Sequence, residues 1–202
     1  MIKILYEQDH GNVTQRFCLA ILQKCSVKET IIGTYLDNDI INWVLKLVKT
    51  SFSIKIHMFC LDFATAMLAN VIHSKWCQIN LANKPEQTIY LMDSILKFIR
   101  EPMEVSVLMH LLITLSYLCR EKFKKQMEEA NIVKRINEFV VLYESNFNRD
   151  GEAAEMDKRT VLDLCSHMFH GKEEDHDTEE RIREYENGQG ELIFECFQDE
   201  VN

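Results

Sequence analysis

Two histidines near the end of an apolar segment are the residues best placed for metal chemistry. His167 and His170 lie three positions apart, and Cys165 precedes them. On a helix this spacing places both imidazoles on one side, where two ring nitrogens could hold a metal ion. No second pair of ligands stands at a suitable spacing. The favoured interpretation is therefore a pair of histidines at a helix C-terminus, where the helix dipole stabilises positive charge.

Other catalytic patterns are weaker. Asp175, His176 and Asp177 resemble part of a metal site or a triad, but they stand in a charge-rich segment without apolar surroundings to shift a pKa. Cys119 and His110 are nine residues apart on one predicted helix, which is too far for a nucleophile and its base. The sequence also lacks a glycine-rich phosphate loop. We therefore expect no enzyme, no metal, no cofactor and no small-molecule substrate.

Four apolar stretches recur along the chain, and each is predicted to end a helix. Their central leucines are Leu22, Leu68, Leu115 and Leu164, which are separated by 46, 47 and 49 residues. The stretches read AILQKCS (20–26), AMLANVI (66–72), ITLSYLC (113–119) and LDLCSHM (162–168). A helical period in the forties is typical of stacked helical repeats, which present an extended surface for binding.

Between these stretches the helices follow a repeating order of short amphipathic, medium amphipathic and long apolar. The predicted units are 28–36, 40–49 and 54–72, then 74–83, 85–98 and 103–119, then 120–130, 132–145 and 153–169. The long helix over 54–72 is apolar nearly all round, which predicts cover on several sides. The last long helix is more polar, as a terminal repeat with a wetted outer face requires.

One more helix precedes these units. Asn12 is a predicted N-cap for a helix that runs to Cys25, and its predicted apolar face is Phe17, Ala20, Ile21 and Cys25. Residues 1–11 are interpreted as the end of a preceding helix or repeat.

Composition supports this all-α interpretation. The chain has 202 residues, of which 47% are hydrophobic, with only six glycines and two prolines. A sandwich, a barrel or a Rossmann sheet needs many more tight turns than these residues provide. No uncharged apolar run approaches the roughly 20 residues of a membrane span. The start, MIKILYEQDHG, is too short and too polar for a signal peptide.

Charge is distributed unevenly. Residues 171–202 hold 12 acidic and three basic residues, so this tail accounts for the whole net charge of −9. A neutral body with an acidic tail gives no electrostatic case for binding nucleic acid or an anionic membrane. The seven cysteines form no CxxC pair and stand mostly in apolar segments. We interpret them as reduced, buried thiols of a cytosolic protein.

The segment IINWVLKLVKTSFSIKIHMFCLDFATAMLANVI (40–72) resembles an armadillo repeat. The second helix of the unit follows the family's Ile-x-x-Leu-Val-x-Leu-Leu pattern, and the third ends like the family's Ala-Leu-Ser-Asn-Leu. The resemblance extends over about 12–170 and implies a right-handed α-solenoid that binds other proteins. Residues 17–49, residues 63–74 and the acidic tail are similar to the ciliary and basal-body armadillo proteins that also carry a LisH motif, which these residues lack.

Many armadillo proteins bind extended peptides through a ladder of asparagines on their third helices. The matching positions in this chain are Lys24, Asn70, Tyr117 and Ser166. A single asparagine cannot hold a peptide backbone along its length, so the resemblance does not imply recognition of basic peptides in this mode. Lys24, Asn70 and Tyr117 stay candidates for contact with another kind of partner.

Two groups of surface residues are further candidates for partner binding. Trp43 and Trp76 each stand near the start of a helix, where they either anchor a partner or pack within the fold. The basic cluster is either a solvated face or a dock for an acidic surface, such as a tubulin tail or the chain's own tail. It consists of Arg120, Lys122, Lys124 and Lys125.

The acidic tail contains one apolar segment, LIFECF (192–197). It is either a docking peptide or a packed extension of the last repeat. Its apolar candidates for partner binding are Leu192, Ile193, Phe194 and Phe197.

These features predict an all-α protein of about three three-helix units in three parts. Residues 1–11 end a preceding helix or repeat, residues 12–170 form the armadillo-like repeats, and residues 171–202 form the acidic tail. The expected function is a non-catalytic scaffold or adaptor in the cytoplasm that binds other proteins. The resemblance implies a cilium, basal-body or axonemal microtubule assembly. The alternative is a soluble armadillo adaptor in trafficking or signalling, unconnected with cilia.

Overall fold

The computed structural model of this chain describes residues 1–7, 12–147 and 151–170, which form helices joined by short connections with no strand among them. All but His170 belong to one compact body, Met1–Phe169. The prediction of an all-α protein is confirmed. The helices are α1 (Ile2–Glu7), α2 (Val13–Cys25), α3 (Glu29–Asp37), α4 (Ile40–Ser51), α5 (Met58–His73), α6 (Lys75–Ala82), α7 (Pro85–Phe98), α8 (Val105–Leu118), the 3₁₀ helix η1 (Glu121–Phe123), α9 (Lys124–Glu129), α10 (Ile132–Asn146) and α11 (Glu152–His170).

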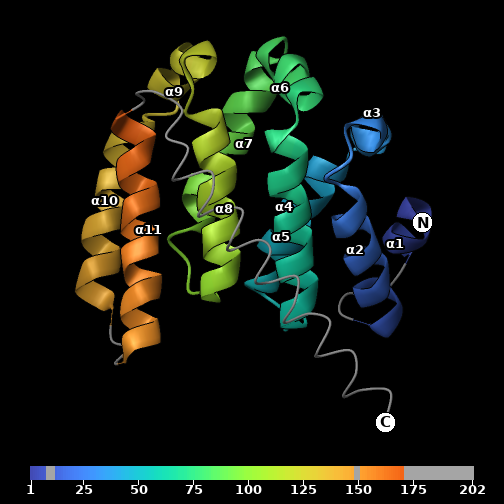
Figure 1. Ribbon diagram of the computed structural model, residues 1–202, viewed down its shortest axis with the longest axis horizontal. Helices are drawn as coiled ribbons and strands as arrows, with labels where there is room; N and C mark the ends of the chain where they lie inside the picture. Colours follow the sequence, from blue (N-terminus) through green and yellow to red (C-terminus); the bar gives the residue numbers. More distant parts are fainter. Residues whose placement is uncertain (8–11, 148–150, 171–202) are drawn as a thin grey trace. The chain divides into compact units, whose positions relative to one another are not determined.

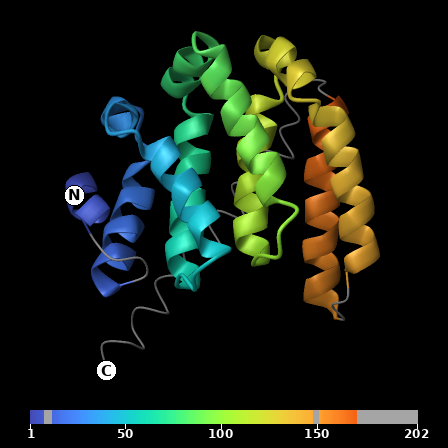
Figure 2. The same cartoon turned by 180° about the vertical axis from the view of Figure 1, so that it is seen from behind.

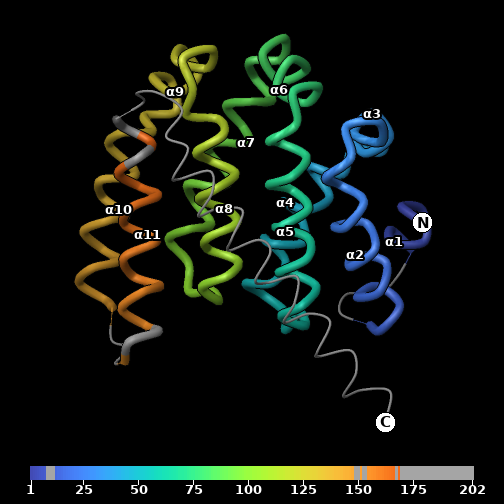
Figure 3. The backbone as a smooth tube through the Cα atoms, viewed as in Figure 1, coloured from blue at the N-terminus to red at the C-terminus, as the bar shows by residue number. Residues whose placement is uncertain are grey.

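The predicted order of short, medium and long helices is present, and Figure 3 traces it along the backbone. Two predicted elements differ. The long helix expected from residue 54 begins at Met58, because His57 is the N-cap and its Nδ1 accepts a hydrogen bond from the Phe59 N–H at 3.3 Å. The short helix expected over 120–130 is divided into η1 and α9.

Side chains at helix starts explain several of the boundaries. Asn12 caps α2 as predicted, since its Oδ1 accepts from the Gln15 N–H at 2.7 Å. Ser74 Oγ caps α6 in the same way by accepting from the Cys77 N–H at 3.1 Å. Pro85 occupies the first turn of α7, where its missing N–H costs nothing. Asp39 stands before α4 in the left-handed region, with φ of 54°, and makes no side-chain cap.

The long helices pack side by side in chain order, α2 against α5 and α5 against α8 (Figures 1 and 2). Contacts near both ends show that neighbours are parallel. Arg16 of α2 lies 3.4 Å from the ring nitrogen Nε2 of His57, the N-cap of α5. At the other end the Asn70 amide of α5 donates to Ser26 Oγ, just after α2, at 2.9 Å.

The core is concentrated in the two middle long helices. Helix α8 buries 11 of its 14 residues and α5 buries ten of its 16. Cover on several sides, as predicted for a helix without a polar face, is thus confirmed for α5. The four leucines that mark the sequence period are all buried, with exposed fractions of 6%, 1%, 0% and 5% for Leu22, Leu68, Leu115 and Leu164.

The sequence period has a direct counterpart in the side-chain contacts. Five bonds between successive units join residues 41 to 46 positions apart, close to the spacing of the leucines. The pairs are Arg16 with His57, Ser26 with Asn70, Glu29 with Lys75, Thr65 with His110, and Gln78 with Lys122. Equivalent parts of neighbouring units therefore meet.

The prediction of which side of α2 is buried is wrong. Phe17 and Ile21 are 46% and 47% exposed, while the buried side is formed by Gln15, Cys18, Leu19 and Leu22. This helix carries apolar residues on two sides, so hydrophobic spacing by itself could not select the side that meets α5.

Helix α1 packs on α2 as α4 packs on α5 and α7 on α8. Its buried residues are Ile2 and Leu5, whereas Ile4 is 47% exposed. That α1 ends a preceding repeat stays a prediction.

Candidate interaction surfaces

The positions that match the asparagine ladder have different roles in the four long helices. Lys24 and Ser166 are exposed. The Asn70 amide donates to Ser26, so it links two units. The Tyr117 ring is 8% exposed and stacks on the His73 ring, with centroids 4.5 Å apart and an interplanar angle of 15°. Asn70 and Tyr117 are thus engaged between units, which is a second reason not to expect a peptide ladder.

The two tryptophans also differ. Trp43 is half-buried and stacks on Tyr6 of α1, with ring centroids 5.7 Å apart. Trp76 lies on α6 and is 59% exposed. Trp43 therefore fastens α1 to α4, and of the two only Trp76 offers a large aromatic surface to a partner.

Three members of the basic cluster make contacts within the chain. The Arg120 guanidinium lies 5.5 Å from the centroid of the Tyr117 ring. Lys122 donates to the Gln78 side chain, and its pKa is lowered first by burial and then by the charge of Arg120. Lys124 lies 3.6 Å from a Glu121 carboxylate oxygen. Lys125 is exposed. Three of the four positive charges are therefore in contact with neighbouring side chains of the same chain.

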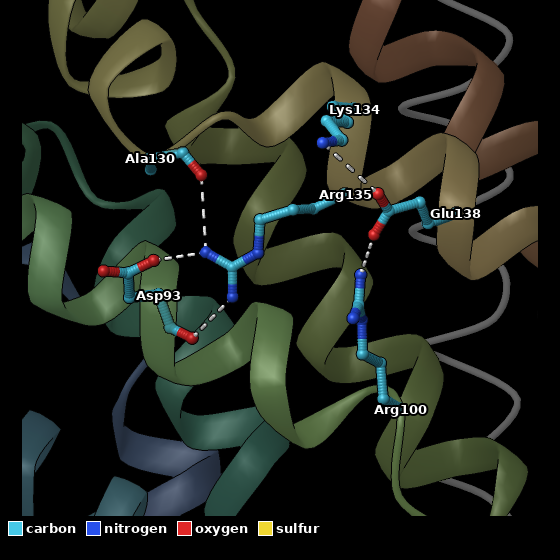
Figure 4. A network of polar contacts seen from close by, with 6 residues as sticks. All are labelled: Asp93, Arg100, Ala130, Lys134, Arg135 and Glu138. Carbon is cyan, nitrogen blue, oxygen red and sulfur yellow. Dashed lines mark hydrogen bonds and ion pairs between the residues drawn. The ribbon is translucent and has the colours of Figure 1, made fainter.

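A network of ion pairs links α7 and the residues just after it to α10, and it was not predicted from the sequence (Figure 4). The Arg135 guanidinium pairs with the Asp93 carboxylate and also donates to the Ala130 carbonyl at 3.3 Å. Arg100 donates to a Glu138 oxygen at 2.5 Å. The only sequence signal is that opposite charges stand 42 and 38 residues apart. Charge-assisted bonds of this kind fix the relative position of two units.

A shallow depression of about 1130 Å³ is lined by residues of α9 and α10 and by Asn131 between them. Its surface is mainly apolar, with Val133 54% and Val141 67% exposed. Two lysines and two glutamates share its rim, namely Lys124, Lys134, Glu128 and Glu138. Because the charges are mixed, the depression favours no single class of charged ligand.

A buried polar cluster joins α5 to α8. The Thr65 hydroxyl donates to the Leu61 carbonyl at 2.8 Å, and its oxygen lies 3.2 Å from His110 Nδ1. Asp62 Oδ1 lies 3.6 Å from the same nitrogen. Burial lowers the pKa of His110, and the Asp62 charge opposes that shift. This pair was not predicted from the sequence, because the two residues stand on different helices.

Burial makes several of the described cysteines less reactive. The six described cysteines are free thiols, and Cys18, Cys60, Cys77 and Cys165 are buried. Burial raises the pKa of Cys60 to about 11 and the pKa of Cys77 to about 12. Burial, and then the neighbouring Cys165, raises the pKa of Cys119 to about 12. Such thiols are protonated at neutral pH and react poorly as nucleophiles.

Several predicted residues lie outside the described parts of the chain. They include the side chains of His167 and His170, the Asp175–Asp177 motif, and Leu192, Ile193, Phe194 and Phe197 of the tail. Within the described parts, no group of three histidine, cysteine or carboxylate residues is placed to hold a metal ion. The same residues contain no helix whose length and apolarity would let it cross a membrane.

Comparisons with protein-family models, with curated proteins and with solved structures find no match for this chain.

Proposed function

We propose that this chain is a non-catalytic scaffold or adaptor that binds other proteins, built as a right-handed armadillo-like α-solenoid of about three units. The observation that carries this proposal is the repeated packing of parallel long helices, in which bonds join residues 41 to 46 positions apart. Stacked repeats of this kind bury a continuous core and leave long outer faces for partners. The raised pKa values of the buried thiols also fit a role without covalent catalysis.

The partners we propose are proteins of a cilium, basal-body or axonemal microtubule assembly. This part rests on the resemblance of residues 17–49 and 63–74 to the ciliary armadillo proteins. A tagged copy expressed in ciliated cells tests it. Signal at basal bodies or axonemes supports the proposal, whereas diffuse or vesicular signal favours an adaptor in trafficking or signalling.

The exposed lysines permit a sharper test of microtubule contact. Replacing Lys124 and Lys125 by glutamine removes two charges from the basic cluster without touching the Lys122 contact to Gln78. If acidic tubulin tails are the ligand, co-sedimentation with microtubules should weaken and lose part of its salt dependence. The matched control replaces Lys46 and Lys49, two exposed lysines of α4, by glutamine. An equal effect of both changes would show non-specific attraction, and no effect of either would remove the idea.

A further inference from the structure

The helices at the C-terminal end of the described fold are buried less than their counterparts. Helix α10 buries three of its 15 residues, whereas α4 buries six of 12 and α7 buries seven of 14. The buried residues among the described side chains of α11 are Val161, Leu164, Cys165 and Met168, against ten in α5 and eleven in α8. We call η1, α9, α10 and α11 the third unit. With less apolar surface buried, this unit is held less firmly than the helices before it.

The two junctions between medium helices also differ in chemistry. Just after α4, the Phe52 ring meets the Phe98 ring of α7, with centroids 5.7 Å apart. Where α7 meets α10, charged side chains meet instead, and both arginine–carboxylate pairs that join two units among the described residues lie here (Figure 4). Added salt screens an ion pair that is not fully buried, whereas it does not weaken an apolar contact. The third unit is therefore joined to α7 by contacts that depend on salt.

Arg135 makes the more enclosed of the two pairs. Its side chain is 20% exposed and the Asp93 side chain is 38% exposed. The second pair, between Arg100 and Glu138, is 40% and 47% exposed. The Arg135 guanidinium also donates to the Asp93 carbonyl at 3.4 Å and to the Ala130 carbonyl at 3.3 Å. Because charge-assisted bonds of a partly enclosed arginine are stronger than an exposed pair, Arg135 makes the larger contribution to this junction.

We propose that the third unit opens as one cooperative element while the helices before it stay folded, and that the ion pair between Arg135 and Asp93 is the latch that sets how often it opens. In stacked repeats each unit contacts only its neighbours, so the last described unit can detach without loss of the contacts between α2, α5 and α8. Opening gives solvent access to the buried side of α11. Higher salt weakens the latch and so increases the open population.

Buried cysteines in the two parts of the fold can report this opening. Cys165 of α11 is 1% exposed, while Cys60 of α5 and Cys77 of α6 are 0% exposed. In the closed fold these thiols react slowly with iodoacetamide, because the reagent cannot reach them and burial keeps them protonated. The test labels the full chain in native buffer and quantifies the cysteine peptides by mass spectrometry. Cys165 then reports opening of the third unit, and the other two cysteines report opening of the helices before it.

The unchanged chain should already show the difference. We expect Cys165 to be labelled at least about tenfold faster than Cys60 and Cys77, since local opening needs less free energy than global unfolding. Between about 0.05 M and about 1 M NaCl at constant pH, the rate at Cys165 should rise roughly two- to fivefold, while the rates at the other two should not rise. Each rate is divided by that of a small free thiol at the same salt concentration.

Arg135→Gln removes the latch. It should raise the labelling of Cys165 about three- to tenfold at low salt and leave little further effect of salt. Hydrogen exchange should show α10 and α11 speeding together, as a cooperative element requires. The matched control is Lys97→Gln, which removes the same charge from an exposed side chain of α7, one turn from Asp93. It should leave the labelling unchanged.

Several results would overturn the proposal. Equal labelling of the three cysteines in the unchanged chain would show that the third unit opens only when the whole fold opens. Exchange that speeds in α11 without α10 would show fraying of a single helix. A Cys165 rate that ignores salt, or an equal effect of Arg135→Gln and Lys97→Gln, would show that the ion pair is not a latch. The salt series uses the unchanged chain, so it decides the matter even if the variant loses helicity in circular dichroism.

Discussion

Helices α2 and α11 expose the same four register positions, but with opposite character. In α2 the positions are Val13, Phe17, Ile21 and Lys24, and in α11 they are Glu155, Arg159, Asp163 and Ser166. In α11 the exposed residues are polar and include an ion pair at 4.0 Å between Arg159 and Asp163. Three of the four in α2 are large and apolar. A polar outer face is what a terminal repeat requires, so the exposed side of α11 has the polarity predicted for a cap, whereas the exposed side of α2 does not.

Helix α8 lies between α2 and α11 in the chain order. A cavity in α8 should cause the largest loss of stability of the three helices. Leu115 is 0% exposed in a helix covered on several sides, whereas Leu22 and Leu164 retain 6% and 5%. We expect Leu115→Ala to lower the free energy of unfolding by about 2–5 kcal/mol, and Leu22→Ala and Leu164→Ala by less, because an end can collapse around a small cavity. Urea unfolding measures all three, and a larger loss at either end would show that the core is not centred on α8.

His110 of α8 occupies the register position that Phe17 has in α2 and Arg159 has in α11. Protonation of His110 should change the stability of the fold. The folded-state pKa of His110 is lowered by burial, so below the unfolded pKa of about 6.5 the unfolded chain binds a proton that the folded chain does not. Stability should therefore fall as pH drops through this range, by at most about 1.4 kcal/mol per pH unit.

His110→Gln isolates that contribution. Between pH 7 and pH 5 the stability of the variant should fall less steeply than that of the unchanged chain, because only the other titrating groups still contribute. Thermal unfolding at several pH values compares it with the unchanged chain, and parallel curves for the two proteins would contradict the assignment. Tyr90→Phe, a conservative change at an exposed site, is the matched control and should leave the pH dependence as it is in the unchanged chain.

Making the exposed side of α11 apolar is the most direct test of the comparison. Glu155→Leu with Arg159→Leu would give α11 two apolar residues one turn apart, as Val13 and Phe17 are in α2. We expect concentration-dependent association of this variant beyond that of the unchanged chain, because a new apolar patch is exposed. Light scattering after size exclusion measures it. Unchanged mass would mean that polarity on α11 does not control association.

The smallest effect should come from the ion pair on α11. Arg159 and Asp163 are 75% and 51% exposed at the side chain. Arg159→Gln should change the free energy of unfolding by no more than about 0.5 kcal/mol, since solvent screens exposed i,i+4 pairs. Chemical denaturation measures it, and a loss above 1 kcal/mol would show that Arg159 packs as well as pairs.

Interactions along a single helix could be read from the sequence. The central leucines, the order of helix lengths and the Asn12 cap depend on residues within one or two turns of one another. The polar side of α11 was foreseen for the same reason. Propensity, capping and periodicity act locally, so one sequence suffices to predict them.

The candidate residues were harder to judge, because their environment depends on a second helix. Trp43 and Trp76 gave the same signal, yet one stacks on Tyr6 and the other is exposed. Asn70 and Tyr117 read as surface rungs and are used between units. The tail residues of the LIFECF segment stay predictions.

The sequence by itself thus determined which segments are helical and how far apart they recur, although not every helix start. Only the tertiary structure decided how each helix is rotated about its axis. That rotation buries Leu22 and leaves Phe17 half exposed, although both are apolar members of α2. It also brings Asp62 to His110 and Asp93 to Arg135 across units. A helix with two apolar sides can bury either side at a similar free energy, and the packing of its neighbours selects one of the two rotations.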